Sequence, residues 1–433
     1  MKEPFLKYYS LFSGLFLTLI LGLFSCKKPT VEPTEPPVDP NLTAMAVEWF
    51  RPFYADSNGA YFADPYLSGD YVAFCATDPL GTTNTPGIGV YNRFTGEKHP
   101  AWQDEPGTNI SLDGVSDWLI SSKYDHLALF RDYQGIHCYD VNSGSEKWSI
   151  GQYNFRQRIN DFGDKLYCSS EIASSTIARL HEIDLQTGQM TTLLQMDAAT
   201  QGGYEPSFES FTGWVAPWGD SVLIFQNRQY KFTGMGGAKT DLYAYNLAAD
   251  TMLWKIDDLI TGGNSSIQKP ELAGNRLFFP GVLAMHCIDL VQGVEVWGRD
   301  YTDIGFGGVP SLYADGVLYA RSEETVLAYD ANTGNNLWRI DNEFGLQTDG
   351  RMGYYQGKLY FTGIDETNTQ TYPTYIFCLD ASDGSVIWKE NRLYDDSFQF
   401  NMADGVIIDQ QNGLLYANAT SHIVCIDLNK TPL

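Results

Sequence analysis

The stretch VLAYDANTGNNLWRI, from Val326 to Ile340, decides the fold. It holds a short alternating apolar run, an Asp-Ala-Asn-Thr-Gly turn and a second short run that carries one Trp. An Asp side chain can bond the backbone of a tight turn, and Gly supplies the left-handed conformation that such turns need. The stretch therefore predicts a β-hairpin whose turn runs from Asp330 to Gly334.

The same phrase recurs eight times along the 433 residues, and each copy is anchored on an Asp or Asn. Successive anchors lie 41 to 62 residues apart, and most copies have a Gly four residues after the anchor. A fixed period of this length indicates a repeat fold built from small, similar units. The anchors are Asn92, Asp140, Asp184, Asn246, Asp289, Asp330, Asp380 and Asp427.

A Trp follows the turn with the same regularity. Five copies place it eight residues after the anchor, at Trp148, Trp254, Trp297, Trp338 and Trp388, and Trp102 lies ten residues after Asn92. The copy at Asp184 has no Trp, and the copy at Asp427 ends before one would occur. A similar Trp strand stands alone around Trp49, so we expect it to complete the last copy.

Two further short strands precede each anchor, which gives four strands in roughly 45 residues. Four-stranded units in a ring make a β-propeller. We therefore predict an all-β protein in which residues 44–433 form an eight-bladed β-propeller with four-stranded antiparallel blades. The Trp49 strand would close the ring by pairing with the last blade (Velcro closure), which removes free sheet edges. Seven blades are the alternative, in which the copy at Asn92 is not a full blade.

The chain is strongly acidic, with 53 Asp and Glu against 28 Lys and Arg and a formal net charge of -25. Such a charge repels nucleic acid and anionic membrane surfaces. We therefore expect no nucleic-acid partner. We also expect a monomer.

The first residues are typical of an export signal. A basic start at Lys2 and Lys7 precedes an apolar run over residues 11–24, too short for a comfortable membrane span. Leu23-Phe24-Ser25-Cys26 resembles a bacterial lipobox, which implies a signal peptide over residues 1–25 and lipidation of Cys26. Residues 26–43 are Pro-rich and predict a semi-rigid tether. An ordinary signal peptide with a chance Cys is the alternative.

Lys27 directly after the Cys, by resemblance to lipoprotein sorting rules, implies the outer membrane and favours its periplasmic face. The lipid anchor would be the chain's sole contact with the membrane.

The phrase Leu327-Ala-Tyr-Asp-Ala-Asn-Thr-Gly-Asn-Asn-Leu-Trp338 resembles the pyrroloquinoline-quinone-type (PQQ-like) propeller repeat. The copies at Asp140, Asp289, Asp330 and Asp380 match it best, and the resemblance covers residues 44–429. Together with the lipobox, the whole chain is similar to BamB-like lipoproteins. That resemblance implies a non-enzymatic, lipid-anchored scaffold for a protein partner in the cell envelope, in the outer-membrane β-barrel assembly machinery.

The same repeat occurs in quinone-dependent alcohol dehydrogenases, which carry two adjacent Cys and an Asp base beside calcium. This sequence has no adjacent Cys and no common hydrolase, phosphate-loop or zinc-protease motif. We therefore predict no catalytic, cofactor-binding or metal-binding residues and no PQQ. The alternative is a ligand-binding propeller, for a quinone or a glycan, or a relative of PQQ-dependent oxidoreductases.

The remaining Cys and three of the His occupy repeated positions. Cys138, Cys287, Cys378 and Cys425 lie two residues before their anchors, and His137, His181 and His286 lie three before theirs. One position repeated on different blades points in different directions around a ring. We therefore expect buried free thiols, also at Cys75 and Cys168, and structural His side chains in place of a zinc site.

Departures from the repeat mark candidate contact residues, because insertions in repeat proteins map to loops. The longest interval, between Asp184 and Asn246, carries the non-repeat Trp214 and Trp218. We predict that these two contact a partner, and packing on an inner strand is the alternative. Arg156, Arg158 and Arg351 precede inner strands, so they are expected to line the central channel and attract an anionic group.

Overall fold

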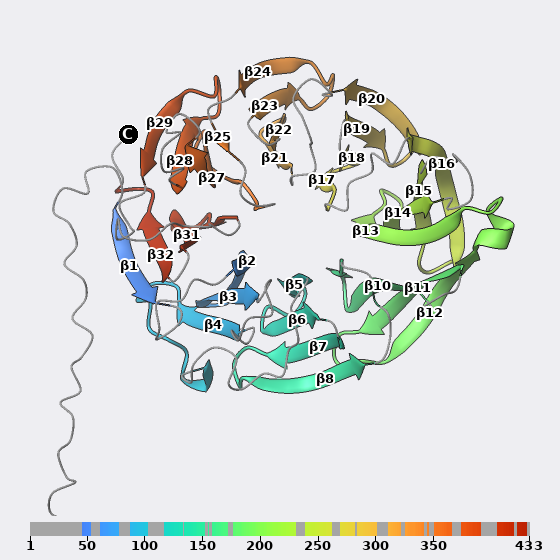
Figure 1. Cartoon of the computed structure of the whole chain (residues 1–433), viewed down its shortest axis with the longest axis horizontal. Helices are drawn as coiled ribbons and strands as arrows, with labels where there is room; N and C mark the ends of the chain where they lie inside the picture. The colour runs from blue at the N-terminus through green and yellow to red at the C-terminus, as the bar shows by residue number, and fades with distance from the viewer. Residues whose placement is uncertain are drawn as a thin grey trace, which may run out of the picture. The chain divides into compact units, whose positions relative to one another are not determined.

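The computed structural model describes residues 46–52, 61–77, 87–102, 117–132, 134–151, 155, 158–171, 176–230, 239–261, 269–281, 284–300, 311–321, 325–341, 344–345, 350–365, 374–390, 405–419 and 422–430. Eight antiparallel sheets stand around a ring, which confirms the prediction of an eight-bladed propeller (Figure 1). None of the helical segments in these ranges has the length and apolarity needed to span a membrane.

The blades are numbered in chain order, with strands given from the centre of the ring outwards. Blade 1 consists of β2 (Tyr61–Ser68), β3 (Tyr71–Thr77) and β4 (Gly87–Asn92), followed by η1 (Pro100–Trp102). Blade 2 consists of β5 (Asp117–Ile120), β6 (Leu127–Arg131), β7 (Gly135–Asp140) and β8 (Ser145–Gly151). Blade 3 consists of β9 (Asn160–Phe162), β10 (Lys165–Glu171), β11 (Ile177–Asp184) and β12 (Met190–Asp197), followed by η2 (Ala198–Thr200). Blade 4 consists of β13 (Glu205–Val215), β14 (Ser221–Tyr230), β15 (Lys239–Asn246) and β16 (Thr251–Thr261).

The second half of the ring repeats this order. Blade 5 consists of β17 (Glu271–Ala273), β18 (Arg276–Pro280), β19 (Ala284–Asp289) and β20 (Val294–Asp300). Blade 6 consists of β21 (Leu312–Ala314), β22 (Val317–Arg321), β23 (Thr325–Asp330) and β24 (Asn336–Asp341). Blade 7 consists of β25 (Phe344–Gly345) and β26 (Gly353–Tyr355), which both pair with β27 (Lys358–Asp365), and then β28 (Thr374–Asp380) and β29 (Val386–Glu390). Blade 8 consists of β30 (Ile407–Asp409), β31 (Leu414–Ala419), β32 (His422–Asp427) and β1 (Val47–Pro52).

The ring closes through β1, as predicted from Trp49. Strand β1 pairs antiparallel with β32, with Phe50 opposite Val424 and Arg51 opposite Ile423. Figure 1 shows this blue strand on the outside of the red last blade. The last sheet therefore takes its outer strand from the other end of the propeller sequence. This pairing completes the last blade with a fourth strand.

Blade 1 differs from the four-stranded pattern within the described residues. After Asn92 the chain makes one isolated bridge, between Tyr91 and Lys98, and then the short η1 segment in place of an outer strand. Trp102 lies in η1, and its Nε1 still donates to the carbonyl of Val141 in blade 2 at 2.6 Å. The two extra residues between anchor and Trp therefore change the local backbone but keep the contact with the next blade.

Each repeated turn is capped by its own anchor. At the opening phrase, Asp330 Oδ1 accepts from the backbone N–H groups of Asn332 at 3.1 Å and Thr333 at 2.8 Å. The N–H of Gly334 donates to the Asp330 carbonyl at 2.7 Å, and Gly334 has φ +66°. These bonds hold the Gly in a left-handed conformation, where a side chain is disfavoured.

The repeated Trp joins six blades to the blade that follows each of them. Its indole N–H donates to a backbone carbonyl in the following turn at 2.6 to 3.0 Å, and in five of these pairs its ring lies over the Gly that ends that turn. Gly144, which follows the Trp102 contact, lies against Ala101 instead. A Cβ placed on Gly334 would lie 2.5 Å from the ring of Trp297. The Gly is therefore required for two separate reasons, its backbone conformation and the space that the indole occupies. The described pairs are Trp49 with Arg93, Trp102 with Val141, Trp148 with Leu185, Trp254 with Leu290, Trp297 with Ala331 and Trp338 with Ala381.

Blade 3 supplies the exception that supports this interpretation. Its outer strand, β12, has no Trp, so no indole from β12 reaches the turn of blade 4. At that turn Asp250 stands four residues after Asn246, where other copies have Gly, and it adopts φ 55°. The missing Trp and the missing Gly thus occur at one and the same blade interface.

The repeated Cys positions face the Trp positions across the outer strand pair. Cys138 lies opposite Trp148, Cys287 opposite Trp297, and all six described Cys are buried free thiols. Burial raises the pKa of Cys138 to about 12. These thiols therefore stay protonated at neutral pH and serve as small apolar side chains.

The three repeated His are structural groups within their own blades. His137 lies 3.3 Å from Asp132, His286 lies 2.8 Å from Glu295, and His181 is buried against the hydroxyl of Ser170 at 2.7 Å. The described residues contain no cluster of three His, Cys, Asp or Glu side chains that could hold a metal ion.

We predict that Gly334→Ala destabilises the protein far more than Gly316→Ala. Both glycines have positive φ, +66° and +84°, but a Cβ at Gly316 would meet nothing within 4 Å. The control should cost about 1 kcal/mol for backbone strain, and Gly334→Ala about 1–3 kcal/mol more because the indole of Trp297 must move. Chemical denaturation of both purified variants tests this. Equal losses would show that the indole contact contributes nothing.

We also predict that His181 makes the protein less stable in mild acid. Burial, with a smaller contribution from Arg179, lowers the pKa of His181 from 6.5 to about 4. The unfolded chain therefore binds this proton below about pH 6.5 and the folded chain only near pH 4, so stability falls as pH falls through that window, by up to roughly 3 kcal/mol. Denaturation at pH 7 and 4.5 should show a smaller acid loss for His181→Gln than for His126→Gln. An unchanged loss in His181→Gln would contradict this assignment.

Candidate functional site

Five charged residues lie in the inner strands or just before them, around the central channel. Four of them lie four residues before the last residue of their inner strand, in blades 1, 3, 5 and 7, and the fifth is the first residue of β5. Equal positions on successive blades lie at equal depth in the ring. We call this set the channel belt: Asp64, Asp117, Arg158, Lys269 and Arg351.

Arg351 connects blade 7 to blade 1. Its Nε lies 2.7 Å from Asp64 Oδ2, its own backbone N–H donates to Asp64 Oδ1 at 3.1 Å, and its guanidinium hydrogen-bonds the hydroxyl of Tyr66. The same guanidinium lies over the Tyr66 ring, 4.6 Å from its centroid. Gly405 of blade 8 also donates to Asp64, at 2.8 Å. Three blades therefore meet at one carboxylate.

Arg158 makes a weaker pair between blades 3 and 2. Its Nη1 lies 3.4 Å from Asp117 Oδ1, while the backbone N–H of Ile159 donates to Asp117 Oδ2 at 2.8 Å. Burial raises the pKa of Asp117 even though Arg158 opposes the shift. Charge and hydrogen bonding thus compensate only part of the desolvation of this carboxylate.

Lys269 reaches across the channel from blade 5 to blade 3. Its Nζ donates to Asn160 Oδ1 at 2.7 Å, and Asn160 Nδ2 in turn donates to the carbonyl of Phe211 in blade 4 at 2.9 Å. Burial among the surrounding blades, and then the charge of Arg351, lowers the pKa of Lys269. Lys269 itself remains accessible to solvent.

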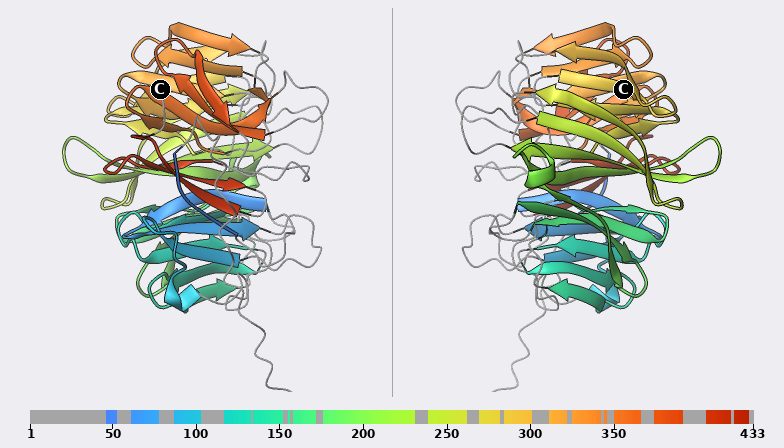
Figure 2. Two further views of the ribbon diagram at one scale, coloured as in Figure 1. Left: turned by 90° about the vertical axis from the view of Figure 1, so that its left-hand side faces the viewer. Right: turned by 90° about the vertical axis from the view of Figure 1, so that its right-hand side faces the viewer.

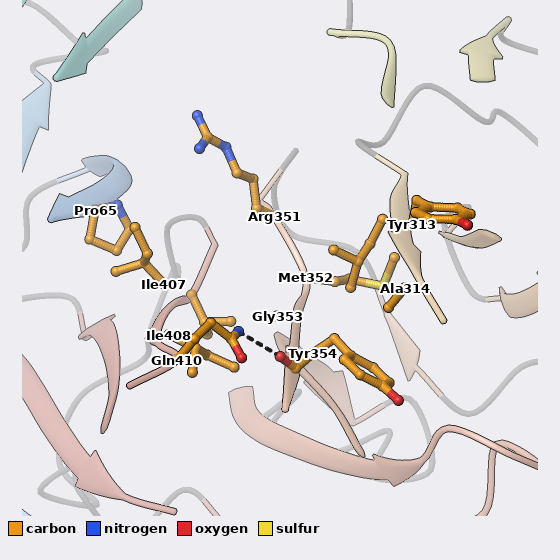
Figure 3. A pocket seen from close by; sticks show the side chains of 12 residues that line it. Pro65, Tyr313, Ala314, Arg351, Met352, Gly353, Tyr354, Ile407, Ile408 and Gln410 are labelled. Atoms are coloured by element: carbon orange, nitrogen blue, oxygen red, sulfur yellow. Dashed lines mark hydrogen bonds between the residues drawn. The ribbon is translucent and has the colours of Figure 1, made fainter. Parts of the chain in front are cut away.

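A hollow of about 310 Å³ opens beside Arg351, between the inner strands of blades 6, 7 and 8 (Figure 3). Its walls are polar and apolar in equal measure, and Gln410 closes one side by donating to the carbonyl of Tyr354 at 2.8 Å. Figure 3 shows the Arg351 side chain directed away from this end of the hollow. The other residues that line it are Pro65, Leu312, Tyr313, Ala314, Met352, Gly353, Val406, Ile407 and Ile408.

The predicted channel arginines can now be placed. Arg158 and Arg351 lie in the channel belt, and Arg156 lies outside the described residues. That they attract an anion stays a prediction. The sequence-based prediction did not include Asp64, Asp117 and Lys269, because their partners lie on other blades, far away in the sequence.

The long interval in blade 4 lengthens two strands and one turn. Strand β13 has 11 residues and β14 has 10, whereas the corresponding first and second strands of the other blades have two to eight residues, and the turn between β13 and β14 spans residues 216–220. Trp214 is only 2% exposed, so it packs in the core, which is the alternative stated for it. Trp218 lies in the turn and is 52% exposed, with its Nε1 donating to Asp220 at 2.9 Å. Figure 2 shows this yellow-green hairpin projecting from the ring.

Exposed apolar side chains are more frequent on blades 4 and 5 than on the other blades, within the described residues. Of the ten large hydrophobic residues described as exposed, seven lie on blades 4 and 5. Trp254 connects the residues on blade 4 with those on blade 5, because its Nε1 donates to the carbonyl of Leu290 in the turn of blade 5. We call the seven the blade 4–5 apolar surface: Val215, Trp218, Met252, Leu253, Val291, Val294 and Val296.

Comparisons with known proteins agree with this architecture. Residues 238–430 match the family model described as "Outer membrane protein assembly factor BamB". No curated protein matches the chain in sequence.

Solved structures share the fold at low sequence identity. BamB from Moraxella catarrhalis is 12% identical, with a TM-score of 0.58 over 88% of this chain and 99% of that one. A quinohemoprotein alcohol dehydrogenase from Pseudomonas putida is 10% identical, with a TM-score of 0.56 over 90% and 77%. Sqt1 from Chaetomium thermophilum, bound to the N-terminus of a ribosomal protein, is 8% identical, with a TM-score of 0.54 over 87% and 98%. With eight blades in one ring and its C-terminal half matched to the BamB model, the chain fits the PQQ-like β-propeller family.

Proposed function

We propose that this protein is a lipid-anchored, non-enzymatic scaffold of the bacterial cell envelope that holds a partner in the outer-membrane β-barrel assembly machinery. The observation that carries the proposal is the blade 4–5 apolar surface, together with the hairpin of blade 4 that projects from the ring and carries Trp218 (Figure 2). The match of residues 238–430 to the BamB family model supports the class of partner.

The chemistry of this surface suits a protein partner. Trp218 presents a large, half-exposed ring, and Trp is enriched among the residues that contribute most to protein interfaces. Large exposed apolar patches on soluble proteins commonly mark interaction sites, whereas singly exposed apolar residues are ordinary. The turn that carries Trp218 is fixed to its own blade, because Asn246 donates to Asp220 at 2.6 Å and Leu247 N–H donates to Ser221 O at 3.0 Å. Docking would therefore need little reordering.

The anchor would hold the scaffold at the membrane. Cys26 and the lipobox lie outside the described residues, and their role is proposed from the sequence resemblance alone. A lipidated Cys26 followed by a Pro-rich tether would keep the ring off the bilayer. We propose the periplasmic face of the outer membrane as its location.

We predict that Cys26→Ser moves the protein out of the membrane fraction. Without the thiol no lipid can be attached, and the remaining contacts of an acidic propeller with an anionic bilayer are repulsive. Fractionation of cells that express each form, followed by blotting, measures the change. A variant that stays in the membrane fraction would show that Cys26 is not the anchor.

We predict that Trp218→Ser weakens binding to the barrel-assembly partner by about tenfold or more, as expected for loss of a central aromatic contact. Leu337→Ser is the matched control, because Leu337 is also 52% exposed but lies on blade 6. In-cell crosslinking and pull-down of the lipidated protein, with quantification of the barrel-assembly component, give the measurement. Equal recovery with both variants would exclude this surface. If no barrel-assembly protein is recovered with the native chain, and its deletion leaves outer-membrane barrels at normal levels, the assembly role is wrong.

A further inference from the structure

Three turn segments of blades 4 and 5 are joined to one another by hydrogen bonds. Asn246 donates to Asp220 at 2.6 Å, which holds the turn between β13 and β14 against the turn that follows Asn246. Trp254 donates to the carbonyl of Leu290 at 2.9 Å, which holds the start of β16 against the turn of blade 5. These segments include six of the seven residues of the blade 4–5 apolar surface, all except Val296. We call them the three-turn surface: residues 215–221, 246–253 and 289–295.

The three-turn surface is acidic and contributes no Lys or Arg of its own. Its carboxylates are Asp220, Asp250, Asp289 and Glu295. Asp220 accepts from the amide of Asn246 and from the indole of Trp218, and Asp250 accepts from the hydroxyl of Tyr245. These donors are neutral, so they do not cancel the negative charge of either carboxylate. Six exposed apolar side chains are therefore interspersed with negative charge.

The cations nearest to these segments are mostly engaged elsewhere. Lys255 ion-pairs with the buried Asp241 at 2.9 Å, and Arg299 donates to two backbone carbonyls in the turn of blade 6. Arg276 lies opposite Asp289 in the pair of β18 and β19, so it offsets that one charge. In the described part of the chain, no Lys or Arg forms an ion pair with the other carboxylates of this surface.

The surface offers side chains for contact in preference to a free sheet edge. Strand β16 is the outer strand of blade 4, but its pairing with β15 shifts register between Thr240 and Leu242 and again between Ala244 and Tyr245. Such bulges twist an edge strand and hinder pairing with another chain. Recognition at this place therefore depends on the exposed side chains of the turns.

We propose that the three-turn surface docks a partner segment whose apolar side chains are flanked by Lys or Arg. This proposal rests on the scaffold role proposed above and names the chemistry of the partner. The apolar contacts, with Trp218 as the largest exposed ring, supply most of the affinity. The carboxylates around them select a basic segment over an acidic one and speed its association, an effect that salt weakens.

The test uses the purified full chain and three dye-labelled peptides that share one pattern of apolar residues. The positions between the apolar residues are Lys in the first peptide, Ser in the second and Glu in the third. Fluorescence anisotropy in dilute and in moderate salt measures the affinity of each peptide.

Two matched variants separate a local effect of charge from attraction to an acidic protein as a whole. Asp250→Asn removes one charge of the three-turn surface, and Asn tolerates the left-handed backbone of that position, φ 55°. Asp315→Asn is the control on blade 6. Asp315 is also exposed, has φ 50° and accepts from a tyrosine hydroxyl, that of Tyr354, at 2.5 Å.

We expect saturable binding of the Lys peptide, about tenfold weaker binding of the Ser peptide and no binding of the Glu peptide in dilute salt. Moderate salt should reduce the difference between the Lys and Ser peptides. Asp250→Asn should weaken binding of the Lys peptide about threefold, as expected for a charge at the rim of an interface, and Asp315→Asn should leave it unchanged. Trp218→Ser should weaken it about tenfold, which attraction by net charge alone does not explain.

Equal affinity for the Lys and Ser peptides, equal losses in the two Asp variants, or no binding of any peptide would each overturn the proposal. The comparison of peptides on the native chain is decisive even if a variant fails to fold. Normal recovery of the barrel-assembly partner without any charge preference among the peptides would refute this chemistry and leave the scaffold role standing. A preference for the Lys peptide without that partner would support the docking surface and refute the assembly role.

Discussion

The ring depends on one contact, an indole from one blade seated on the glycine turn of the next. Sheets in a propeller meet face to face, and apolar packing alone leaves their angle and register loosely fixed. The indole fixes how two neighbouring blades are oriented. Its N–H donates to one carbonyl, and its face fits only against a residue without a side chain, as Trp297 does against Gly334. The contact also crosses the closure of the ring, where Trp49 of the final blade bonds Arg93 of the first. Closure is therefore one more copy of an ordinary blade interface.

Blade 4 lacks this contact and compensates for it. No Trp arrives from β12, Asp250 takes the place of Gly, and the blade uses longer strands to hold its position. Its interior is held in part by ion pairs, such as Arg228 with Glu209 at 3.0 Å and Lys255 with the fully buried Asp241 at 2.9 Å. The same lengthening produces the hairpin that carries Trp218. The departure from the repeat and the candidate interaction surface are thus products of one local change.

The fold could be predicted from sequence because its determinants are local. An Asp, a Gly and a Trp at fixed spacing specify a hairpin and its neighbour, and counting them gives eight blades. The role of Trp214 could not be predicted in the same way. Whether a residue in a long interval lies on a strand or in a loop depends on the register of β13 against β14, which places Trp214 opposite Val222 in the core. The contacts of the channel belt could not be predicted either. Lys269 and Asn160, for example, are 109 residues apart and come into contact only in the folded ring.

The charge distribution separates the two candidate sites physically. A net charge of -25 repels anions from the outer surface, and the apolar surface of blades 4 and 5 lies within that field. The channel belt carries charges of both signs, and four of its five charges are paired there, Arg351 with Asp64 and Arg158 with Asp117. The excess negative charge of the chain therefore acts mainly at its outer surface. A partner that docks on blades 4 and 5 must approach through this field, which salt screens.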